Sequence, residues 1–324
     1  MNDKLKVVFL GSGPIAVPIL RALAAAPEIV LSAVVSQPDR PAGRKRVPTP
    51  TPLAAAALAL GLTPLRTENV NTPEFLDFLR GLAPDLLCVV SFGQILRSDV
   101  LAAPKSGCVN VHASLLPAYR GASPIAQAIR NRDAETGVCF MAMERGLDSG
   151  GVYRRLSLPL DGTEYADALE LRLGELAASH AAETLREIAA HRLVPVPQDP
   201  AKVTVCRKIA KPDGAVDWNA SAAVIEAMSR AYCPWPGATA RCRIPDGREI
   251  TVTLRRCREA AGFALAPGRC AELPGRLVVG CGGNSALEIL EILPSGGKLM
   301  SAAAFRNGMR GKLPEFIAEF PAGN

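Results

Sequence analysis

The sequence predicts an α/β domain built on a parallel sheet, followed by a smaller β-barrel domain. Three observations predict this fold class: strand-like and helix-like patterns alternate over residues 1–190, a stretch with three prolines follows at 193–200, and short β-prone runs separated by Gly/Pro turns come after it. Prolines interrupt helices and favour an extended connector. We therefore expect a first domain at 1–190, a linker at 191–206 and a second domain at 207–324.

Hydrophobic periodicity defines the elements of the first domain. The expected strands are Leu5–Leu10, Val30–Val35, Leu86–Val90, Cys108–Val111 and Val138–Met143. The expected helices are Pro14–Ala25, Thr51–Leu60, Thr72–Leu82 and Tyr165–Ile188. Such alternation is typical of a parallel sheet that is covered by helices on both faces.

The second domain has a different pattern, with one helix and several short strands. The expected helix is Ser221–Ala231, and the expected strands are Ala238–Ile244, Glu249–Cys257, Arg276–Val279 and Leu287–Leu293. Strands of this length and spacing indicate a small barrel. An OB-type barrel is one possibility, and the pattern does not distinguish it from other small barrels.

The positive charge of the chain is concentrated in its last third. The formal net charge is +6; residues 201–324 carry 17 basic and 11 acidic side chains, whereas residues 1–200 carry 20 of each. This asymmetry suits a surface that binds a polyanion such as nucleic acid, and a solvated basic face is the plain alternative.

Composition excludes several classes of protein. A hydrophobic content of 48% with 21% charged residues is ordinary for a globular protein. No run approaches the roughly 18 apolar residues of a membrane span, and no signal peptide precedes the first strand, so we expect no membrane association and a cytoplasmic location. The nine cysteines include no CxxC pair, which supports neither a disulfide framework nor a zinc site. We expect no bound metal.

The segment Asn110–Pro117 carries the strongest chemical signal. Asn110 and His112 are two positions apart, so in a strand their side chains project to the same face. They come at the carboxyl end of a predicted strand, which is the ligand-binding end of an open α/β sheet. An amide and an imidazole there can stabilise an oxyanion and exchange a proton. A hydrogen-bonded structural histidine is the alternative.

Asp148 lies in the glycine-rich segment Gly146–Gly151, directly after another predicted strand. We expect this loop at the same carboxyl edge of the sheet, where Asp148 would reach His112 and orient it. An Asx turn is the alternative interpretation. No serine or cysteine is matched with a base as a nucleophile, so acyl transfer directly to an external amine fits the three residues best.

Two further segments have weaker signals. The turn Gly11–Pro14 contains half of a dinucleotide-binding fingerprint, but a tight strand-to-helix turn explains its glycines and is the favoured interpretation. Four basic residues in the Pro/Gly loop that follows Ser36 suit contacts with phosphates, or simply an exposed connection; they are Arg40, Arg44, Lys45 and Arg46.

Taken together, eight segments in this order resemble the methionyl-tRNA formyltransferases over essentially the whole chain. They are Gln37–Arg44, Ser91–Leu96, Asn110–Pro117, Arg120–Pro124, Asp133–Gly137, Gly146–Gly150, Asp217–Trp218 and Pro234–Pro236. The resemblance implies a Rossmann-like formyltransferase domain with a parallel sheet, a linker, and an OB-like domain that binds tRNA. Two departures are the turn Gly11–Ile15 and Gly151, which stands where an acidic residue is common.

The resemblance also implies an activity and its residues. The formyl donor would be 10-formyltetrahydrofolate, and the acceptor would be the α-amino group of methionyl initiator tRNA, giving N-formylmethionyl-tRNA for translation initiation. Asn110, His112 and Asp148 match the catalytic trio. Folate would bind at Phe92, Gly93, Gln94, Ile95, Leu96, Ser114, Leu115, Leu116 and Pro117. The loop with Arg40, Arg44, Lys45 and Arg46 would contact tRNA, and the protein would act as a monomer.

Three alternatives remain open on the sequence. The first is a sister enzyme that formylates glycinamide ribonucleotide or an amino sugar, or that hydrolyses formyltetrahydrofolate; a small acceptor would leave the basic loop and basic barrel without a role. The second is a non-catalytic RNA-binding protein, which leaves the trio unused. The third is a nicotinamide dehydrogenase, which the incomplete glycine fingerprint disfavours.

Overall fold

The protein is described by a computed structural model that covers residues 4–42, 46–310 and 312–317. The chain forms two compact units that interleave in sequence. The first unit contains the chain up to Pro124, Glu135–Pro159 and Ala168–Arg207. The second contains Ile125–Ala134, Leu160–Asp167 and the chain from Lys208 onward. The predicted linker at 191–206 thus lies in the first unit, and the domain boundaries at 190 and 207 stay a prediction.

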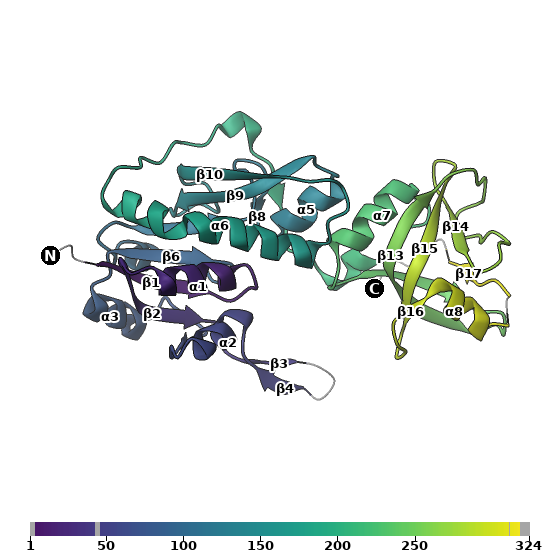
Figure 1. Cartoon of the computed structure of the whole chain (residues 1–324), viewed down its shortest axis with the longest axis horizontal. Coiled ribbons are helices and arrows are strands. Elements are labelled where there is room, and N and C mark those ends of the chain that lie inside the picture. Colours follow the sequence, from purple (N-terminus) through teal and green to yellow (C-terminus); the bar gives the residue numbers. More distant parts are fainter. Residues whose placement is uncertain (1–3, 43–45, 311, 318–324) are drawn as a thin grey trace. The chain divides into compact units, whose positions relative to one another are not determined.

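A mixed sheet of seven strands forms the centre of the first unit, in the order β10-β9-β7-β6-β1-β2-β5. Figure 1 labels β10, β9, β6, β1 and β2 of this sheet. Its strands are β1 (Leu5–Gly11), β2 (Ile29–Ser36), β5 (Leu65–Arg66), β6 (Leu86–Val90), β7 (Cys108–His112), β9 (Glu135–Ala142) and β10 (Val152–Pro159). Residues 7–11 of β1 and all of β6 are buried, as expected for strands covered on both faces.

The expectation of a wholly parallel sheet is wrong at one edge. Strands β5, β2, β1, β6 and β7 run parallel, whereas β9 is antiparallel to both β7 and β10. A short loop joins β9 to β10, and a short connection joins only antiparallel strands. The continuous apolar run of β9 is compatible with either direction, so the sequence pattern did not reveal it.

Helices pack on the sheet, and two of them begin at a threonine cap. The helices are α1 (Ala16–Ala25), α2 (Pro52–Ala59), α3 (Pro73–Leu82), α4 (Ser98–Leu101) and α6 (Ala166–Ala189). The hydroxyls of Thr51 and Thr72 each accept a hydrogen bond from a backbone N–H in the first turn of α2 and α3, respectively. Each of these helices opens with proline. Helix α3 packs on the sheet face that carries Val8 and Leu10.

Short elements complete the first unit. They are the hairpin β3 (Arg40–Ala42) and β4 (Val47–Thr49), and the pair β8 (Arg120–Gly121) and β11 (Val205–Cys206), with the 3-10 turn Pro200–Lys202. The parallel pair β8–β11 brings the predicted linker against the loop that follows β7. Residues 191–206 are therefore folded onto the first unit.

The second unit is an antiparallel barrel with the strand order β14-β15-β13-β12-β17 and β16 beside β15. Its elements are α5 (Pro124–Arg130, from Ile125 onward), the 3-10 turn Lys211–Gly214, α7 (Ala222–Ala231), β12 (Ala238–Arg243), β13 (Glu249–Ala260), β14 (Leu277–Cys281), β15 (Ser285–Pro294), β16 (Met300–Ser301), α8 (Ala302–Gly308) and β17 (Glu315–Phe316). Gly268 bonds to Gly280 on β14 and to Phe316 on β17, so this loop nearly closes the barrel. Trp218 packs on Phe316 in its core, with ring centroids 4.9 Å apart.

The fold class predicted from the sequence is confirmed: a Rossmann-like α/β unit and a small β-barrel unit. Among the described helices, none combines the length and the hydropathy that crossing a bilayer requires.

Candidate active site

Three polar side chains meet on one face of the sheet in the first unit. Asn110 and His112 project from the same face of β7. Nδ2 of Asn110 lies 3.5 Å from Oδ1 of Asp148, and Nδ1 of His112 lies 3.7 Å from Oδ2 of the same carboxylate. Only 6% of the His112 side chain and 14% of the Asp148 side chain are exposed. The structure therefore brings together the trio that the sequence singled out.

Asp148 reaches the trio by a route that differs from the one expected. We expected the loop after β9 at the carboxyl edge of the sheet, beside the end of β7. Because β9 is antiparallel to β7, it ends beside the start of β7, with Ala142 opposite Val109. The loop then folds back over the sheet, so tightly that a Cβ on Gly150 would lie 2.0 Å from the Ala142 carbonyl oxygen.

Backbone groups of residues 119–121 hold both His112 and Asp148. The Tyr119 carbonyl accepts a hydrogen bond from Nε2 of His112 at 2.9 Å. A carbonyl only accepts, so this contact places a ring proton on Nε2 and leaves Nδ1 facing Asp148. The N–H of Gly121 donates to Oδ2 of Asp148 at 2.8 Å. Tyr119 has a φ of 59°, which a bulky residue rarely adopts, so the segment 119–121 carries backbone strain.

The hydroxyl and thiols near the trio are not placed as nucleophiles. Ser114 is fully buried, and its hydroxyl donates to the Ala118 carbonyl at 2.6 Å. Cys139 lies opposite His112 on β9, and burial raises the pKa of its thiol to about 11. Burial also raises the pKa of the Cys206 thiol. Since the thiolate is the reactive form, the arrangement favours direct transfer to an external acceptor.

The two loops predicted to bind folate begin at the carboxyl ends of two neighbouring strands. Residues 91–96 follow β6 and residues 113–117 follow β7, and these strands are parallel neighbours. This is the ligand-binding edge of an open α/β sheet. Ile95 is 79% exposed, which is unusual for a large apolar side chain and provides an apolar contact surface.

The remaining residues predicted to bind folate divide by exposure. Gly93 is exposed, whereas Leu115 and Pro117 are half-buried. Phe92, Leu96, Ser114 and Leu116 are buried in the described structure. Gln94 uses its amide internally: Oε1 accepts from the N–H of Val70, and Nε2 donates to the Thr67 carbonyl, both at 2.9 Å. The buried members therefore shape the loops, and a folate role for this set stays a prediction.

The predicted tRNA-binding loop is partly described. Strands β3 and β4 pair as an antiparallel hairpin that projects from the first unit (Figure 1). Arg40 lies 3.6 Å from Glu68, with both side chains mostly exposed, and Arg46 is exposed. Arg44 and Lys45 lie outside the described residues. A role for this hairpin in binding tRNA stays a prediction.

Much of the basic charge of the barrel is already paired with carboxylates. Arg243 lies 2.9 Å from Glu249, Arg269 lies 2.8 Å from Glu315, and Arg241 also pairs with Glu249. Arg255 differs, because its guanidinium donates to uncharged groups, Sγ of Cys233 and the Pro234 carbonyl. The excess of basic side chains in this part of the sequence therefore overstates the positive charge that is available to a polyanion.

Sequence reasoning missed Gln198, which it assigned to an extended connector. The Nε2 group of Gln198 donates to the carbonyls of Asp148 and Gly150, and its Oε1 accepts from Arg120. A single glutamine in a proline-rich stretch has no motif or spacing that would have identified it.

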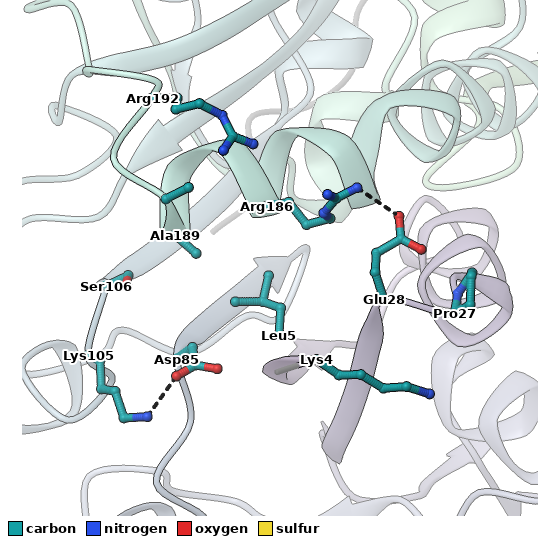
Figure 2. Close-up of a pocket in the computed structure, with 11 residues that line it drawn as sticks. Lys4, Leu5, Pro27, Glu28, Asp85, Lys105, Ser106, Arg186, Ala189 and Arg192 are labelled. Carbon is teal, nitrogen blue, oxygen red and sulfur yellow. Dashed lines mark hydrogen bonds and ion pairs between the residues drawn. The ribbon is translucent and has the colours of Figure 1, made fainter. Parts of the chain in front are cut away.

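A separate cavity lies at the amino-terminal ends of the strands of the same sheet (Figure 2). Leu5 at the start of β1 and Asp85 just before β6 line it. Lys105 pairs with Asp85 at 2.8 Å, and Arg186 lies 3.5 Å from Glu28. The trio is reached from the carboxyl end of β7, so this cavity is not part of the candidate active site. Within the described residues, no group of three or more His, Cys, Asp or Glu side chains is arranged to hold a metal ion.

Comparisons with known proteins identify the family. The Formyl transferase family model matches residues 5–185, and the model of the formyl transferase C-terminal domain matches residues 208–310. The methionyl-tRNA formyltransferase of Acidithiobacillus ferrooxidans is 41% identical over 317 residues, which cover 98% of this chain and 100% of that protein. The chain belongs to the methionyl-tRNA formyltransferase family. The family member from Roseiflexus castenholzii is 41% identical over 306 residues, covering 94% of this chain and 96% of that protein.

A solved structure agrees on the fold. WlaRD, a sugar 3N-formyl transferase crystallised in the presence of dTDP and 5-N-formyl-THF, superposes with a TM-score of 0.62 at 15% identity, covering 90% of this chain and 97% of that chain. At this identity the likeness concerns the fold alone. Family membership makes the protein a formyl-transferring enzyme, and the non-catalytic and dehydrogenase alternatives are excluded.

Proposed function

We propose that the protein transfers the formyl group of 10-formyltetrahydrofolate to the α-amino group of methionyl initiator tRNA, with Asn110, His112 and Asp148 as its catalytic residues. The observation that carries the proposal is the convergence of these three side chains at the edge of the sheet where ligands bind. Relatives named methionyl-tRNA formyltransferase, matched over nearly the whole chain, support the acceptor.

A folate donor fits the loops at this edge. Ile95 offers an exposed apolar side chain on the loop after β6, and the half-buried Leu115 lies on the loop after β7. We assign the folate to these two loops, with the buried residues Phe92, Leu96 and Leu116 supporting them. The presence of 5-N-formyl-THF with the structurally similar WlaRD agrees with a folate donor. When bound, the folate supplies an activated formyl carbon and leaves as tetrahydrofolate.

Each residue of the trio has a distinct task in the transfer. As the methionyl amine forms its bond to the formyl carbon, negative charge develops on the formyl oxygen, and the Asn110 amide donates a hydrogen bond to it. His112 Nε2 is held by Tyr119, whereas Nδ1 is 3.7 Å from Asp148, beyond a direct hydrogen bond. We therefore assign proton uptake from the amine to Nδ1, with Asp148 stabilising the charged ring. The bond between the formyl carbon and the donor nitrogen breaks. The proton lost by the amine is balanced by the proton that this departing nitrogen takes up.

The tRNA would be held outside the trio. We assign Arg40, Arg44, Lys45 and Arg46 to contacts with its phosphates and the barrel unit to further backbone contacts. Action as a monomer in the cytoplasm stays a prediction from the family resemblance.

Formyl transfer assays test this proposal. The purified protein is given 10-formyltetrahydrofolate with charged initiator tRNA, charged elongator methionine tRNA, or a small amine, and hydrolysis of the donor is measured in parallel. We expect initiator tRNA to be formylated by far the fastest. His112→Ala and Asp148→Asn should each lower kcat by about 100-fold or more, since general acid–base catalysis contributes about 10²–10⁴.

His191→Ala is the matched control, because this histidine is exposed and lies at the end of α6. It should retain normal kcat. Near-normal activity of either trio variant would refute the assignment of catalytic residues. Preferential transfer to a small amine or to water would instead move the protein to a sister formyltransferase or a hydrolase.

A further inference from the structure

We propose that Gln198, on the segment predicted to be an extended linker, is a positioning residue that holds the Asp148 loop in register with His112. The inference rests on the catalytic roles proposed above for the trio. It makes the linker a functional part of the active site as well as a connection between units.

The buried side-chain amide of Gln198 uses all of its hydrogen-bonding capacity. Only 9% of the residue is exposed. Its Nε2 donates to the Asp148 carbonyl at 2.8 Å and to the Gly150 carbonyl at 2.7 Å. Its Oε1 accepts from Nε and Nη2 of Arg120 at 3.0 and 2.9 Å. A primary amide has two N–H groups and two lone pairs, so a side chain of another kind leaves buried polar groups without partners.

The linker also holds the opposite side of the trio. The Thr204 carbonyl accepts from the N–H of Arg120 at 2.9 Å, and the Thr204 hydroxyl accepts from the N–H of Tyr119 at 2.8 Å. Tyr119 and Gly121 are the residues whose backbone groups bind His112 and Asp148. One stretch of linker therefore fixes both the arm that orients the imidazole and the loop that carries the carboxylate.

Two close approaches leave this arrangement little freedom. A Cβ on Gly121 would lie 2.2 Å from the Cys206 carbonyl oxygen, and a Cβ on Gly151 would lie 2.9 Å from Cβ of Pro195. Gly151 is one of the departures from the family pattern, and here its missing side chain makes room for the linker. The Asp148 loop is thus packed against the linker at Pro195 and bonded to it at Gln198.

Arg120 connects the two sets of linker contacts, those of Gln198 and those of Thr204. Its backbone belongs to β8, which pairs with β11 of the linker, and its side chain binds Gln198. A shift of Gln198 would therefore move the Asp148 carboxylate relative to His112, where the present separation is 3.7 Å. Misplacement of a catalytic group by about 1 Å costs on the order of 10²-fold in rate.

The test compares Gln198→Met with Gln127→Met, the same substitution on α5, where Nε2 of Gln127 donates to Oδ1 of Asn131 at 3.0 Å. We expect Gln198→Met to lower kcat about 10- to 100-fold and to change KM for the folate and the tRNA less than about 3-fold. Gln198→Glu keeps an acceptor for Arg120 but turns a carboxylate toward two carbonyls, and it should lose as much kcat. Gln127→Met should match the parent.

A double-mutant cycle distinguishes positioning from general destabilisation. If Gln198 acts through the trio, adding Gln198→Met to His112→Ala should cost less than about 2-fold, because the imidazole against which Gln198 holds the Asp148 carboxylate is already gone. A purely structural role predicts that the two losses multiply. The chain has only three histidines, so imidazole ¹⁵N spectra provide a second readout. Gln198→Met should shift the His112 signals and leave those of His180 and His191 unchanged.

The outcomes separate this inference from the proposal on which it rests. Near-normal activity of His112→Ala would overturn the catalytic trio and this inference with it. Loss of activity in His112→Ala with unchanged kcat in folded Gln198→Met and Gln198→Glu would overturn the positioning role alone. Multiplicative losses in the cycle, with unshifted His112 signals, would also overturn it.

Discussion

Glu288 in the barrel gives a prediction whose size follows from the structure. Its side chain is 5% exposed and meets two guanidinium groups. Nε and Nη2 of Arg276 donate to its two oxygens, both at 2.8 Å, and Nε of Arg258 donates at 2.7 Å. These bonds, above all those from Arg276, lower the pKa of Glu288 from 4.5 to about 2. At 1.36 kcal/mol per pKa unit, the shift corresponds to about 3 kcal/mol of stability.

The sign of the pH dependence follows from the lowered pKa. The unfolded chain binds a proton at Glu288 more readily than the folded protein does, so the contribution is complete above about pH 4.5 and disappears as the pH falls toward 2. Glu288→Gln should therefore lower the free energy of unfolding of the barrel unit by about 3 kcal/mol at pH 7. The difference from the parent should shrink steadily below about pH 4.5.

Urea unfolding followed by tryptophan fluorescence measures this directly, because Trp218 and Trp235, the chain's two tryptophans, both lie in the second unit. Glu272→Gln is the control, since Glu272 is exposed. A loss below about 1 kcal/mol for Glu288→Gln at pH 7, or a loss that stays constant down to pH 3, would refute the reasoning.

Two further predictions concern the first unit and the cysteines. Gly121→Ala should lower Tm well beyond Gly162→Ala, because both glycines have positive φ but only Gly121 would place its Cβ against a neighbouring carbonyl; equal shifts in thermal unfolding would contradict this. Burial raises the pKa of the Cys88, Cys108, Cys242 and Cys270 thiols to about 12, so a thiol reagent at pH 8 should label the native protein rapidly at no site beyond the half-buried Cys233, and all nine cysteines only after denaturation. Rapid labelling of any other cysteine in the native protein would show that the buried thiols are accessible.

The order of strands and helices was predictable because it depends on local patterns. Apolar runs bounded by turn residues identified β1, β2, β6, β7 and β9. An Ala/Leu-rich run identified α2, and a capped amphipathic segment identified α3. The strand β10 was missed because its exposed outer face breaks the apolar run, with Arg155 and Ser157 exposed along it. The direction of β9 depends on how its connections cross the sheet, which no local pattern encodes.

The candidate site divides in the same way. Asn110 and His112 were predictable as a pair because a strand repeats every two residues, so their shared face follows from spacing alone. Asp148 does lie beside His112 as expected, but by another route than the one argued from the sequence, since its loop folds back over the sheet. Gln198 was not predictable, because its function depends on contacts with residues about 50 positions away.

The sequence by itself determined the two-unit α/β and barrel architecture, the family and the pair of side chains on β7, since each of these depends on local periodicity or on ordered motifs. Only the tertiary structure decided the antiparallel edge of the sheet, the tautomer imposed on His112 by Tyr119, and the engagement of the linker with the Asp148 loop. These features arise from hydrogen bonds between segments distant in sequence, and a backbone carbonyl or N–H can offer such a bond at any residue, so side-chain identity does not reveal where it forms.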